Sequence, residues 1–253
     1  MDPGHRGGPP PARPRAGAAD HPRQRPRRLH PDPPGARSGA GRRSPGAVQV
    51  SASPFVKVCG LSTAQDVAAA VAHGADALGF VLTPSPREVS PALAAELLSA
   101  VPAAVATVAV FRSEDADTAI RLSRQAGVGW IQLHGRRTPE DIAAVKAAGF
   151  HAIRAVRMDA GASEFEDWGE DFLLIDAAVP GSGESWDYAA VRELAAGRRW
   201  LVAGGLHSGN VAGALEQSQA SGADVSSGVE SSRGVKDPQL IAAFLDAAKT
   251  RAG

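Results

Sequence analysis

Residues 200–228, with the sequence WLVAGGLHSGNVAGALEQSQASGADVSSG, contain the pattern that decides the fold. Two short apolar runs, Trp200–Ala203 and Ala223–Val225, stand near its two ends. Between them Ser208 precedes a helical stretch, Gly209–Gln219, and serine is a preferred residue at a helix N-cap. A strand, a helix and a second strand in this order are typical of a parallel sheet.

The same alternation extends outward from this segment over the chain from Phe55 onward. Strands buried on both faces of a parallel sheet are short and almost wholly apolar. Eight runs of this kind are predicted as strands: Phe55–Cys59, Ala77–Leu82, Ala104–Phe111, Trp130–Leu133, Ala152–Val156, Phe172–Ile175, Trp200–Ala203 and Ala223–Val225. Eight strand–helix units in about 200 residues favour an α/β fold of the closed (β/α)8 type, the TIM barrel, over an open doubly wound sheet.

Ser or Thr caps, Pro in the first turn and Gly after the last turn mark the predicted helices. Five of them are Ala64–His73, Ala92–Ala100, Glu140–Ala148, Gly209–Gln219 and Gln239–Arg251. The connection Arg157–Asp171 is poor in helix signals, so we expect the outer helix after the fifth strand to be short or missing.

The first fifty residues have a different composition. They contain eleven Pro, eight Gly, ten Arg and no aromatic residue. Such a segment cannot bury enough apolar surface to offset its ordering entropy. We therefore predict a disordered tail over residues 1–52, followed by the barrel domain over residues 53–253. The tail could be a basic arm or a transit peptide, but a dispensable tail or a translation start chosen upstream of the true one is favoured.

Charge and cysteine content favour a small-molecule role. After residue 50 the chain has 17 basic and 24 acidic residues, which is the opposite of the balance expected of a nucleic-acid enzyme. The single cysteine, Cys59, excludes an internal disulfide and a multi-cysteine zinc site. No apolar run is long enough for a membrane helix or a secretory signal, so we expect a cytoplasmic protein without membrane or nucleic-acid partners.

Small and reactive residues follow the strands at one edge, where the active sites of such barrels lie. Gly204 and Gly205 follow the seventh strand, and Ser227 and Gly228 follow the eighth. Glycines let backbone N–H groups approach a phosphate closely, and these two loops form the recurrent phosphate site of the fold. We predict a phosphate site there, with simple turn formation as the alternative.

Several segments in order resemble the phosphoribosylanthranilate isomerase family of tryptophan biosynthesis. They are KVCG, GADALGFVLTPSPREVS, VAVF, QLHG, LLIDAAVPGSGESWDY, VAGGLHSGNV and DVSSGVESSRGVKD, which together span about residues 56–245. The resemblance implies an Amadori rearrangement of N-(5′-phosphoribosyl)anthranilate to the 1-deoxyribulose phosphate, without cofactor or metal.

The resemblance implies a base and an acid. The base is the cysteine of the KVCG motif, Cys59, and the acid is the aspartate that ends strand six, Asp176. For these roles we expect the pKa of Cys59 to be lowered or its proton passed on, and the pKa of Asp176 to be raised by burial or nearby negative charge. The alternatives are an inert buried cysteine and an aspartate that only caps or orders its loop.

Other residues receive roles from the same resemblance. Arg87 faces the anthranilate end and its carboxylate, with a surface arginine as the alternative. Gln132 and His134 point into the site or organise their loop, and Asp224 supports the site. From strand parity, Lys57 points inward beside Cys59, where it either favours the thiolate or forms an interior ion pair.

One loop departs from the family pattern. The family has Gly-Gly-Thr-Gly after the acid, whereas this chain has Pro180, then Gly181, Ser182 and Gly183, then Glu184. Ser182 can replace the threonine hydroxyl, so we keep these three residues as phosphate ligands. Pro180 removes one backbone donor and Glu184 adds a negative charge, so we expect this loop to alter substrate affinity.

Two other functions are compatible with a barrel of this kind. The histidine-pathway isomerase carries out the same rearrangement on a different nucleotide, but it uses an aspartate where this chain has Cys59. A dual-substrate enzyme of that type is disfavoured, and so is a barrel that binds sugar phosphates without catalysis. The expected partner is a small phosphorylated substrate, and the expected state is a monomer or homodimer.

Overall fold

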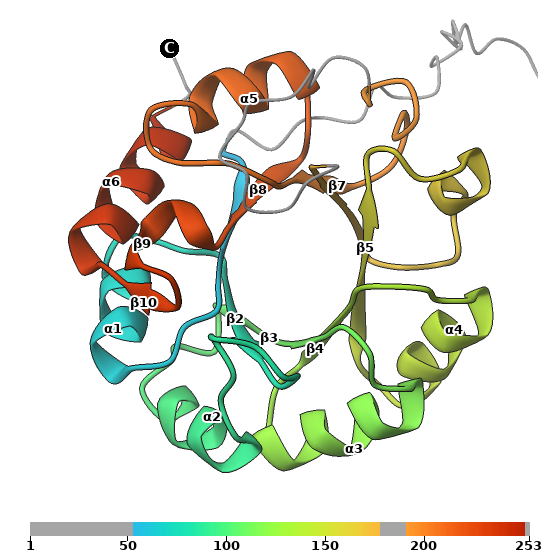
Figure 1. Ribbon diagram of the computed structural model, residues 1–253, viewed down its shortest axis with the longest axis horizontal. Helices are drawn as coiled ribbons and strands as arrows, with labels where there is room; N and C mark the ends of the chain where they lie inside the picture. Colours follow the sequence, from blue (N-terminus) through green and yellow to red (C-terminus); the bar gives the residue numbers. More distant parts are fainter. Residues whose placement is uncertain (1–52, 178–190, 251–253) are drawn as a thin grey trace, which may run out of the picture. The chain divides into compact units, whose positions relative to one another are not determined.

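The computed structural model describes residues 53–177 and 191–250. The predicted tail therefore lies outside the described residues. Within them, eight parallel strands close into a barrel in the order of the chain, with β1 paired to both β2 and β8 (Figure 1). The strands are β1 (Phe55–Cys59), β2 (Ala77–Val81), β3 (Ala106–Phe111), β4 (Trp130–Leu133), β5 (His151–Arg157), β6 (Phe172–Asp176), β7 (Trp200–Val202) and β8 (Gly222–Val225). The predicted fold class is confirmed, with strand ends that shift by one or two residues.

Helices surround the ring of strands (Figure 1). They are α1 (Ala64–Ala72), α2 (Pro91–Leu98), α3 (Ala116–Ala126), α4 (Pro139–Ala147), α5 (Val211–Ser218) and α6 (Pro238–Lys249). Three predicted caps are present, since the side chains of Thr63, Ser90 and Thr138 each accept a backbone N–H in the first turn of the helix that follows. The predicted cap at Ser208 is wrong, because α5 begins only at Val211, after a turn in which the Asn210 side chain accepts the His207 N–H. Helix α3 was not predicted, although Asp115 caps its start and Gly127 ends it in the left-handed conformation.

The connection after β5 contains no α-helix, as predicted. It holds one turn of 3₁₀ helix, Ala162–Phe165. Arg154 of β5 is 1% exposed and donates to the carbonyl oxygens of Glu164 and Glu166 and to the carboxylate of Glu170. This buried arginine therefore anchors the irregular segment against the outside of the barrel, where a helix would otherwise pack.

Two apolar layers hold the barrel together. One lies between the strands and the helices, and the other fills the barrel interior with residues such as Val108, Ile153, Leu174 and Leu201. Strand side chains alternate between these layers, as the two-residue period of a strand requires. The interior also holds three buried polar side chains, Lys57, Gln132 and Asp224. Because polar groups are costly to bury in an apolar interior, these positions point to function.

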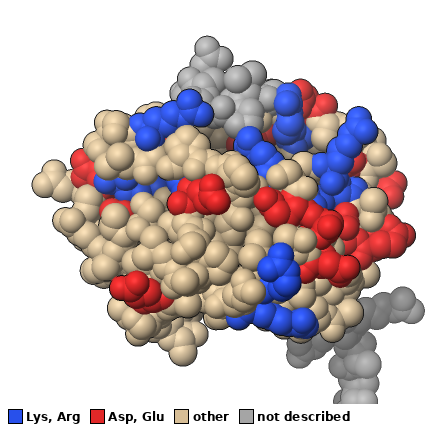
Figure 2. Space-filling view, turned by 60° about the horizontal axis from the view of Figure 1, so that its bottom comes forward, with Lys and Arg blue, Asp and Glu red and all other residues tan. Residues whose placement is uncertain are grey.

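The connection from β8 to α6 carries an extra hairpin. A short 3₁₀ turn, Ser227–Val229, is followed by the antiparallel strands β9 (Glu230–Ser232) and β10 (Val235–Lys236). The hairpin brings Glu230 and Lys236 to the carboxyl edge of the barrel. Figure 2 shows one face of the molecule, on which acidic and basic side chains are mixed and no continuous basic surface forms.

Candidate active site

A pocket of about 1020 Å³ lies at the carboxyl ends of the strands. Side chains from most of the strand ends and from the loops after β2, β7 and β8 line it. Its polar lining includes Cys59, Thr83, Ser85, Arg87, Arg112, Gln132, His134, Asp176, Asp224, Ser226, Ser227 and Glu230. The two predicted catalytic residues and the four predicted substrate-binding residues thus lie in one pocket, at the edge where sequence placed them.

Cys59 ends β1 with its side chain inside the barrel. Gly79 on the neighbouring strand leaves space for it, because a Cβ at Gly79 would lie 2.9 Å from the Cys59 Sγ. Burial raises the pKa of the Cys59 thiol, and Asp224 adds to this, whereas Lys57 and Lys236 oppose it. The expected lowering of the thiol pKa is therefore wrong for the free protein, because the loss of hydration outweighs the two nearby cations.

Lys57 pairs with Asp224 across β1 and β8. The two residues are register partners, and Lys57 Nζ donates to Asp224 Oδ1 over 2.8 Å. Burial alone would lower the pKa of Lys57, but Asp224 and Cys59 together raise it. Lys57 thus forms the interior ion pair and also opposes the rise in the Cys59 pKa, so both sequence interpretations of Lys57 apply.

Asp176 ends β6. Burial, and then the Asp224 carboxylate, raises the pKa of Asp176 to about 6, although the Ala177 N–H, Arg112 and Arg157 oppose the rise. The predicted upward shift is confirmed. Gly204 packs directly against this carboxyl group, since a Cβ at Gly204 would lie 2.8 Å from Asp176 Oδ1. The chemistry available here is that of a carboxylic acid that can hold a proton near neutral pH.

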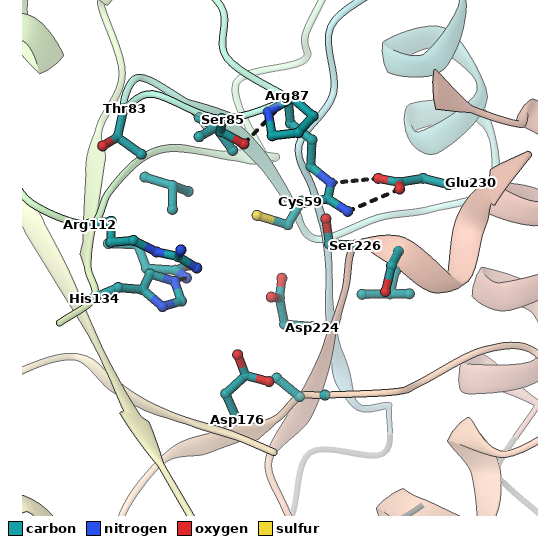
Figure 3. A pocket seen from close by; sticks show the side chains of 18 of the residues that line it. Cys59, Thr83, Ser85, Arg87, Arg112, His134, Asp176, Asp224, Ser226 and Glu230 are labelled. Carbon is teal, nitrogen blue, oxygen red and sulfur yellow. Dashed lines mark hydrogen bonds and ion pairs between the residues drawn. The ribbon is translucent and has the colours of Figure 1, made fainter. Parts of the chain in front are cut away.

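The thiol and the carboxyl group come from β1 and β6, which β7 and β8 separate in the ring of strands. In Figure 3 the Cys59 and Asp176 side chains both point into the pocket, and the Asp224 side chain lies between them. A ligand in this space would contact a potential base on one side and a potential acid on the other.

Gln132 and His134 stand together at the end of β4. Gln132 Nε2 faces His134 Nε2, and a neutral imidazole can accept this bond. Burial lowers the pKa of His134 to about 3, with contributions from Lys57, Arg112 and Arg137, so the ring is neutral at physiological pH. Gln132 Oε1 is buried and has no hydrogen-bond partner in the described part of the chain.

Arg87 lies in the loop after β2, and its side chain is engaged by a residue that sequence reasoning missed. Its Nε and one Nη donate to the two carboxylate oxygens of Glu230 over 2.6 and 3.0 Å. Burial would raise the pKa of Glu230, but bonds from Arg87, Lys236 and the Gly234 N–H lower it to about 2. The only sequence signal for Glu230 was its position shortly after the Ser-Ser-Gly turn.

The predicted phosphate residues fall into three groups. Gly204, Gly205 and Ser227 line the pocket. Gly228 does not line it, because it packs on the loop after β7, where a Cβ would collide with the Leu206 carbonyl oxygen. Gly181, Ser182 and Gly183 lie outside the described residues.

Arg112 follows β3 and lines the pocket, although no role was predicted for it from the sequence. Figure 3 shows its side chain beside His134 in the pocket. Its positive charge lowers the pKa values of both Asp176 and His134. Arg112 therefore belongs to the electrostatic environment of the acid.

Two further properties concern the described residues only. Over residues 53–177 and 191–250, no group of three or more His, Cys, Asp or Glu side chains is arranged to hold a metal ion. None of the helices in the same ranges is long and apolar enough to cross a membrane.

The fold and the pocket define a (β/α)8-barrel enzyme of the acid–base type, with a thiol and a carboxyl group of raised pKa facing one polar cavity. Residues 56–247 match the family model described as N-(5′-phosphoribosyl)anthranilate (PRA) isomerase. The chain belongs to this family.

Similar proteins agree with this assignment. The N-(5′-phosphoribosyl)anthranilate isomerase of Rhodospirillum centenum is 42% identical over 205 residues, which cover 75% of this chain and 95% of the relative. The crystal structure of TrpF from Jonesia denitrificans has a TM-score of 0.70 at 40% identity and covers 78% of this chain and 97% of its own. A phosphoribosyl anthranilate isomerase in complex with reduced 1-(o-carboxyphenylamino)-1-deoxyribulose 5-phosphate has a TM-score of 0.68 at 29% identity, over 77% and 98% of the two chains.

Proposed function

We propose that this chain isomerises N-(5′-phosphoribosyl)anthranilate to 1-(2-carboxyphenylamino)-1-deoxyribulose 5-phosphate in tryptophan biosynthesis, with Cys59 as the base and Asp176 as the acid. One observation carries the assignment of roles: the two groups face each other across a single pocket of a chain that belongs to the isomerase family. The reaction requires one group that gives a proton and one that removes a proton from carbon.

Asp176 acts first. Its carboxylic acid protonates the ribose ring oxygen, the bond from C1′ to that oxygen breaks, and the nitrogen lone pair forms a C1′=N Schiff base. The raised pKa of Asp176, about 6, keeps a useful fraction of the acid form near neutral pH. A bound phosphate would add negative charge and favour the protonated form further.

Cys59 acts second. Its thiolate removes the C2′ proton, the C–H electron pair becomes the C1′=C2′ bond, and the nitrogen recovers its lone pair to give an enolamine. The enolamine tautomerises to the ketone. Lys57 and Lys236 favour the thiolate that this step needs, because both lower the pKa of Cys59 against the effect of burial.

The remaining pocket residues bind the two ends of the substrate. Gly204, Gly205 and Ser227 provide the phosphate site in the loops after β7 and β8, with Gly181, Ser182 and Gly183 as further ligands. Arg87 binds the anthranilate carboxylate at the other end. Gln132 Oε1 accepts a hydrogen bond from the substrate, since a buried oxygen without a protein partner needs a donor.

The expected partners follow from this function. The ligand is a small phosphorylated molecule, and the chain is a monomer or a homodimer. A 29%-identical relative from Thermotoga maritima is described as a dimeric isomerase from which monomers were generated. Light scattering of the purified chain would separate the two states. The cytoplasmic location stays a prediction, which cell fractionation with immunodetection would test.

The direct test follows the fluorescence of phosphoribosylanthranilate, which disappears as the substrate is consumed. We expect wild type to consume it, and Cys59→Ala and Asp176→Asn to lose at least about 1000-fold in kcat, as removal of an essential acid or base does. The imidazole nucleotide of the histidine pathway, run in parallel, should not be converted. An inactive wild type would overturn the proposal.

A further inference from the structure

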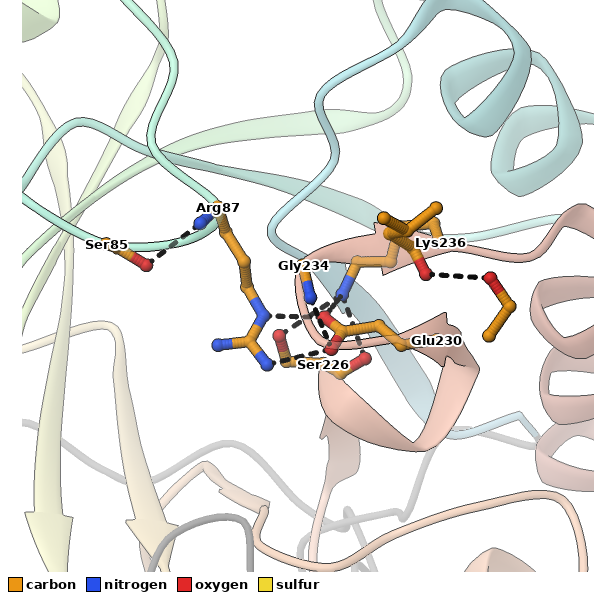
Figure 4. A network of polar contacts seen from close by, with 8 residues as sticks. Ser85, Arg87, Ser226, Glu230, Gly234 and Lys236 are labelled. Atoms are coloured by element: carbon orange, nitrogen blue, oxygen red, sulfur yellow. Dashed lines mark hydrogen bonds and ion pairs between the residues drawn. The ribbon is translucent and has the colours of Figure 1, made fainter.

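The loop after β2 and the hairpin after β8 meet around the Arg87 side chain (Figure 4). Glu230 of β9 accepts two hydrogen bonds from Arg87, one from the Gly234 N–H over 3.0 Å and one from Lys236 Nζ over 2.8 Å. Lys236 Nζ also donates to the carbonyl oxygen of Ser226 over 2.8 Å and to its hydroxyl over 3.2 Å. We call Arg87, Glu230 and Lys236 the hairpin triad.

The backbone around the triad is shaped to fit the arginine stem. Gly60 has a φ of +79°, and a Cβ there would lie 2.7 Å from the Arg87 Cδ. The turn residue of the hairpin, Gly234, packs on the Pro86 carbonyl oxygen, where a Cβ would lie at 2.7 Å. The Arg87 N–H donates to Ser85 Oγ over 3.1 Å. Arg87 is therefore held at its backbone, along its stem and at its guanidinium.

Burial separates the inner and outer members of the triad. The side chains of Lys236 and Glu230 are 0% and 4% exposed, whereas that of Arg87 is 23% exposed. Arg87 and Glu230 both line the pocket, whereas Lys236 does not. A partly exposed cation held by a nearly buried carboxylate, with a fully buried lysine behind it, is the arrangement expected of a preorganised binding group.

The charges of the triad explain why two cations share one carboxylate. Arg87 and Glu230 alone would form a neutral pair, and an incoming anion would meet little net charge. Lys236 adds a second positive charge, so the triad carries a net charge of +1. The guanidinium keeps one edge for a ligand, because Glu230 takes only the Nε–H and one Nη–H of its five donors.

We infer that Glu230 and Lys236 are positioning residues, which hold the open edge of the Arg87 guanidinium toward the pocket for the carboxylate of the substrate's anthranilate ring. This inference rests on the proposed function. Neither residue contacts the reacting atoms, so the effect of Glu230 is on binding of the carboxylate end and not on proton transfer. Lys236 has a second effect, because its charge also lowers the pKa of Cys59. A purely structural hairpin would affect all ligands of the pocket alike.

The test compares two phosphorylated ligands that differ only in the carboxylate. One is the reduced product analogue, 1-(2-carboxyphenylamino)-1-deoxyribitol 5-phosphate, and the other is its phenylamino counterpart. Isothermal titration with wild type, Glu230→Gln and Lys236→Met gives the Kd of each. We expect both variants to weaken the carboxylated ligand about tenfold and the other less than about twofold. Glu230→Gln should raise KM about tenfold with little change in kcat, whereas Lys236→Met should lower kcat as well, because Lys236 also lowers the pKa of Cys59.

Two controls sharpen the result. Glu216→Gln removes an exposed carboxylate from α5 and should change neither ligand's Kd. In an Arg87→Met background, Glu230→Gln should not change the Kd of the carboxylated ligand further, because the guanidinium that Glu230 holds is absent. If one triad variant fails to fold, as judged by its circular dichroism melt, the other still decides.

Equal weakening of both ligands, or of neither, would overturn the positioning role while leaving the isomerase function intact. An effect of Glu230→Gln that persists in the Arg87→Met background would overturn it as well. Absence of wild-type turnover, by contrast, would count against the proposed function, and the ligand comparison would still report on the triad.

Discussion

Lys57 and Asp224 form an ion pair inside the barrel, with Nζ 2.8 Å from Oδ1 and the Lys57 side chain fully buried. They are register partners in the pairing of β1 with β8. Cys59 is two residues after Lys57 in β1, so both side chains lie on the same face of the strand. The pair therefore places a cation under the thiol and a carboxylate between the thiol and Asp176. The Lys57 charge lowers the pKa of the proposed base, Cys59, whereas the Asp224 charge raises the pKa values of both Cys59 and the proposed acid, Asp176.

Lys57→Met should damage both stability and catalysis. The variant leaves the Asp224 carboxylate buried without its partner, which we expect to cost about 3–5 kcal/mol in the free energy of unfolding. It also removes the largest effect that opposes the rise in the Cys59 pKa, so kcat/KM should fall at least about tenfold and the alkaline limb of its pH profile should move upward. Urea unfolding and pH–rate profiles measure the two effects.

The double variant Lys57→Met with Asp224→Asn is the matched control. It should recover most of the lost stability, because no charge is left buried, but it should not recover activity. An unmoved alkaline limb in Lys57→Met would show that the lysine does not act on the thiol.

The pH dependence of kcat/KM should be a broad bell. The active form needs Asp176 protonated and Cys59 ionised, yet the Asp176 pKa is about 6 and burial holds that of Cys59 above the roughly 8.5 of a free thiol. Activity should thus fall tenfold per pH unit below about pH 6 and again above the thiol pKa. Between these limits activity should be nearly independent of pH, and only a minor fraction of the molecules carries the active pair of protonation states.

Arg112→Met provides the check on the acid limb. Arg112 lowers the pKa of Asp176, so its removal should raise that pKa and move the acid limb upward, while the alkaline limb stays in place. A profile with its acid limb near pH 4 in wild type would contradict the raised pKa.

Asp176→Asn should lose activity and gain stability. The folded-state pKa of Asp176, about 6, lies above the roughly 3.9 of an unfolded aspartate, so this group disfavours folding as pH rises through 4 to 6. Asparagine removes that penalty. We expect the variant to be more stable than wild type by about 1–2 kcal/mol at pH 8 and by almost nothing at pH 4. Urea denaturation at both pH values measures this difference, and a gain of equal size at both would exclude an effect of ionisation.

The strand positions and most of the pocket could be predicted from sequence for a physical reason. A strand buried on both faces must be mostly apolar, and a polar or reactive residue at its carboxyl end marks the pocket, as at Cys59 and Asp176. Helix α3 was missed although its cap, Asp115, and its end, Gly127, are both typical. Its buried residues, Ala116, Ala119, Ile120, Ser123 and Ala126, also recur at helical spacing, so the sequence held the signals for this helix.

The hairpin triad could not be predicted in the same way. Glu230 is 143 positions from Arg87 in the chain, and a run such as ESSRGVK has no local sign of a buried ion network. Of the two possibilities expected for Cys59, a lowered pKa or a proton passed on, the lowered pKa was wrong. Strand parity placed Lys57 beside the thiol correctly, but the balance between burial and nearby charges depends on distances in the folded chain.

Gly79→Ala should displace the Cys59 thiol, the proposed base, while leaving the cysteine itself unchanged. A Cβ at Gly79 would lie 2.9 Å from the Cys59 Sγ and 3.1 Å from the Lys57 Nζ, so both side chains must move. We expect kcat to fall about 10- to 100-fold, because small misplacements of a reacting group are costly, and stability to fall by about 1–3 kcal/mol from overpacking. Gly129→Ala is the matched control, since a Cβ there meets nothing within 4 Å, and it should leave kcat unchanged. Fluorescence assays and urea unfolding of both variants test this, and a fully active Gly79→Ala would argue against the proposed position of the thiol at the reacting carbon.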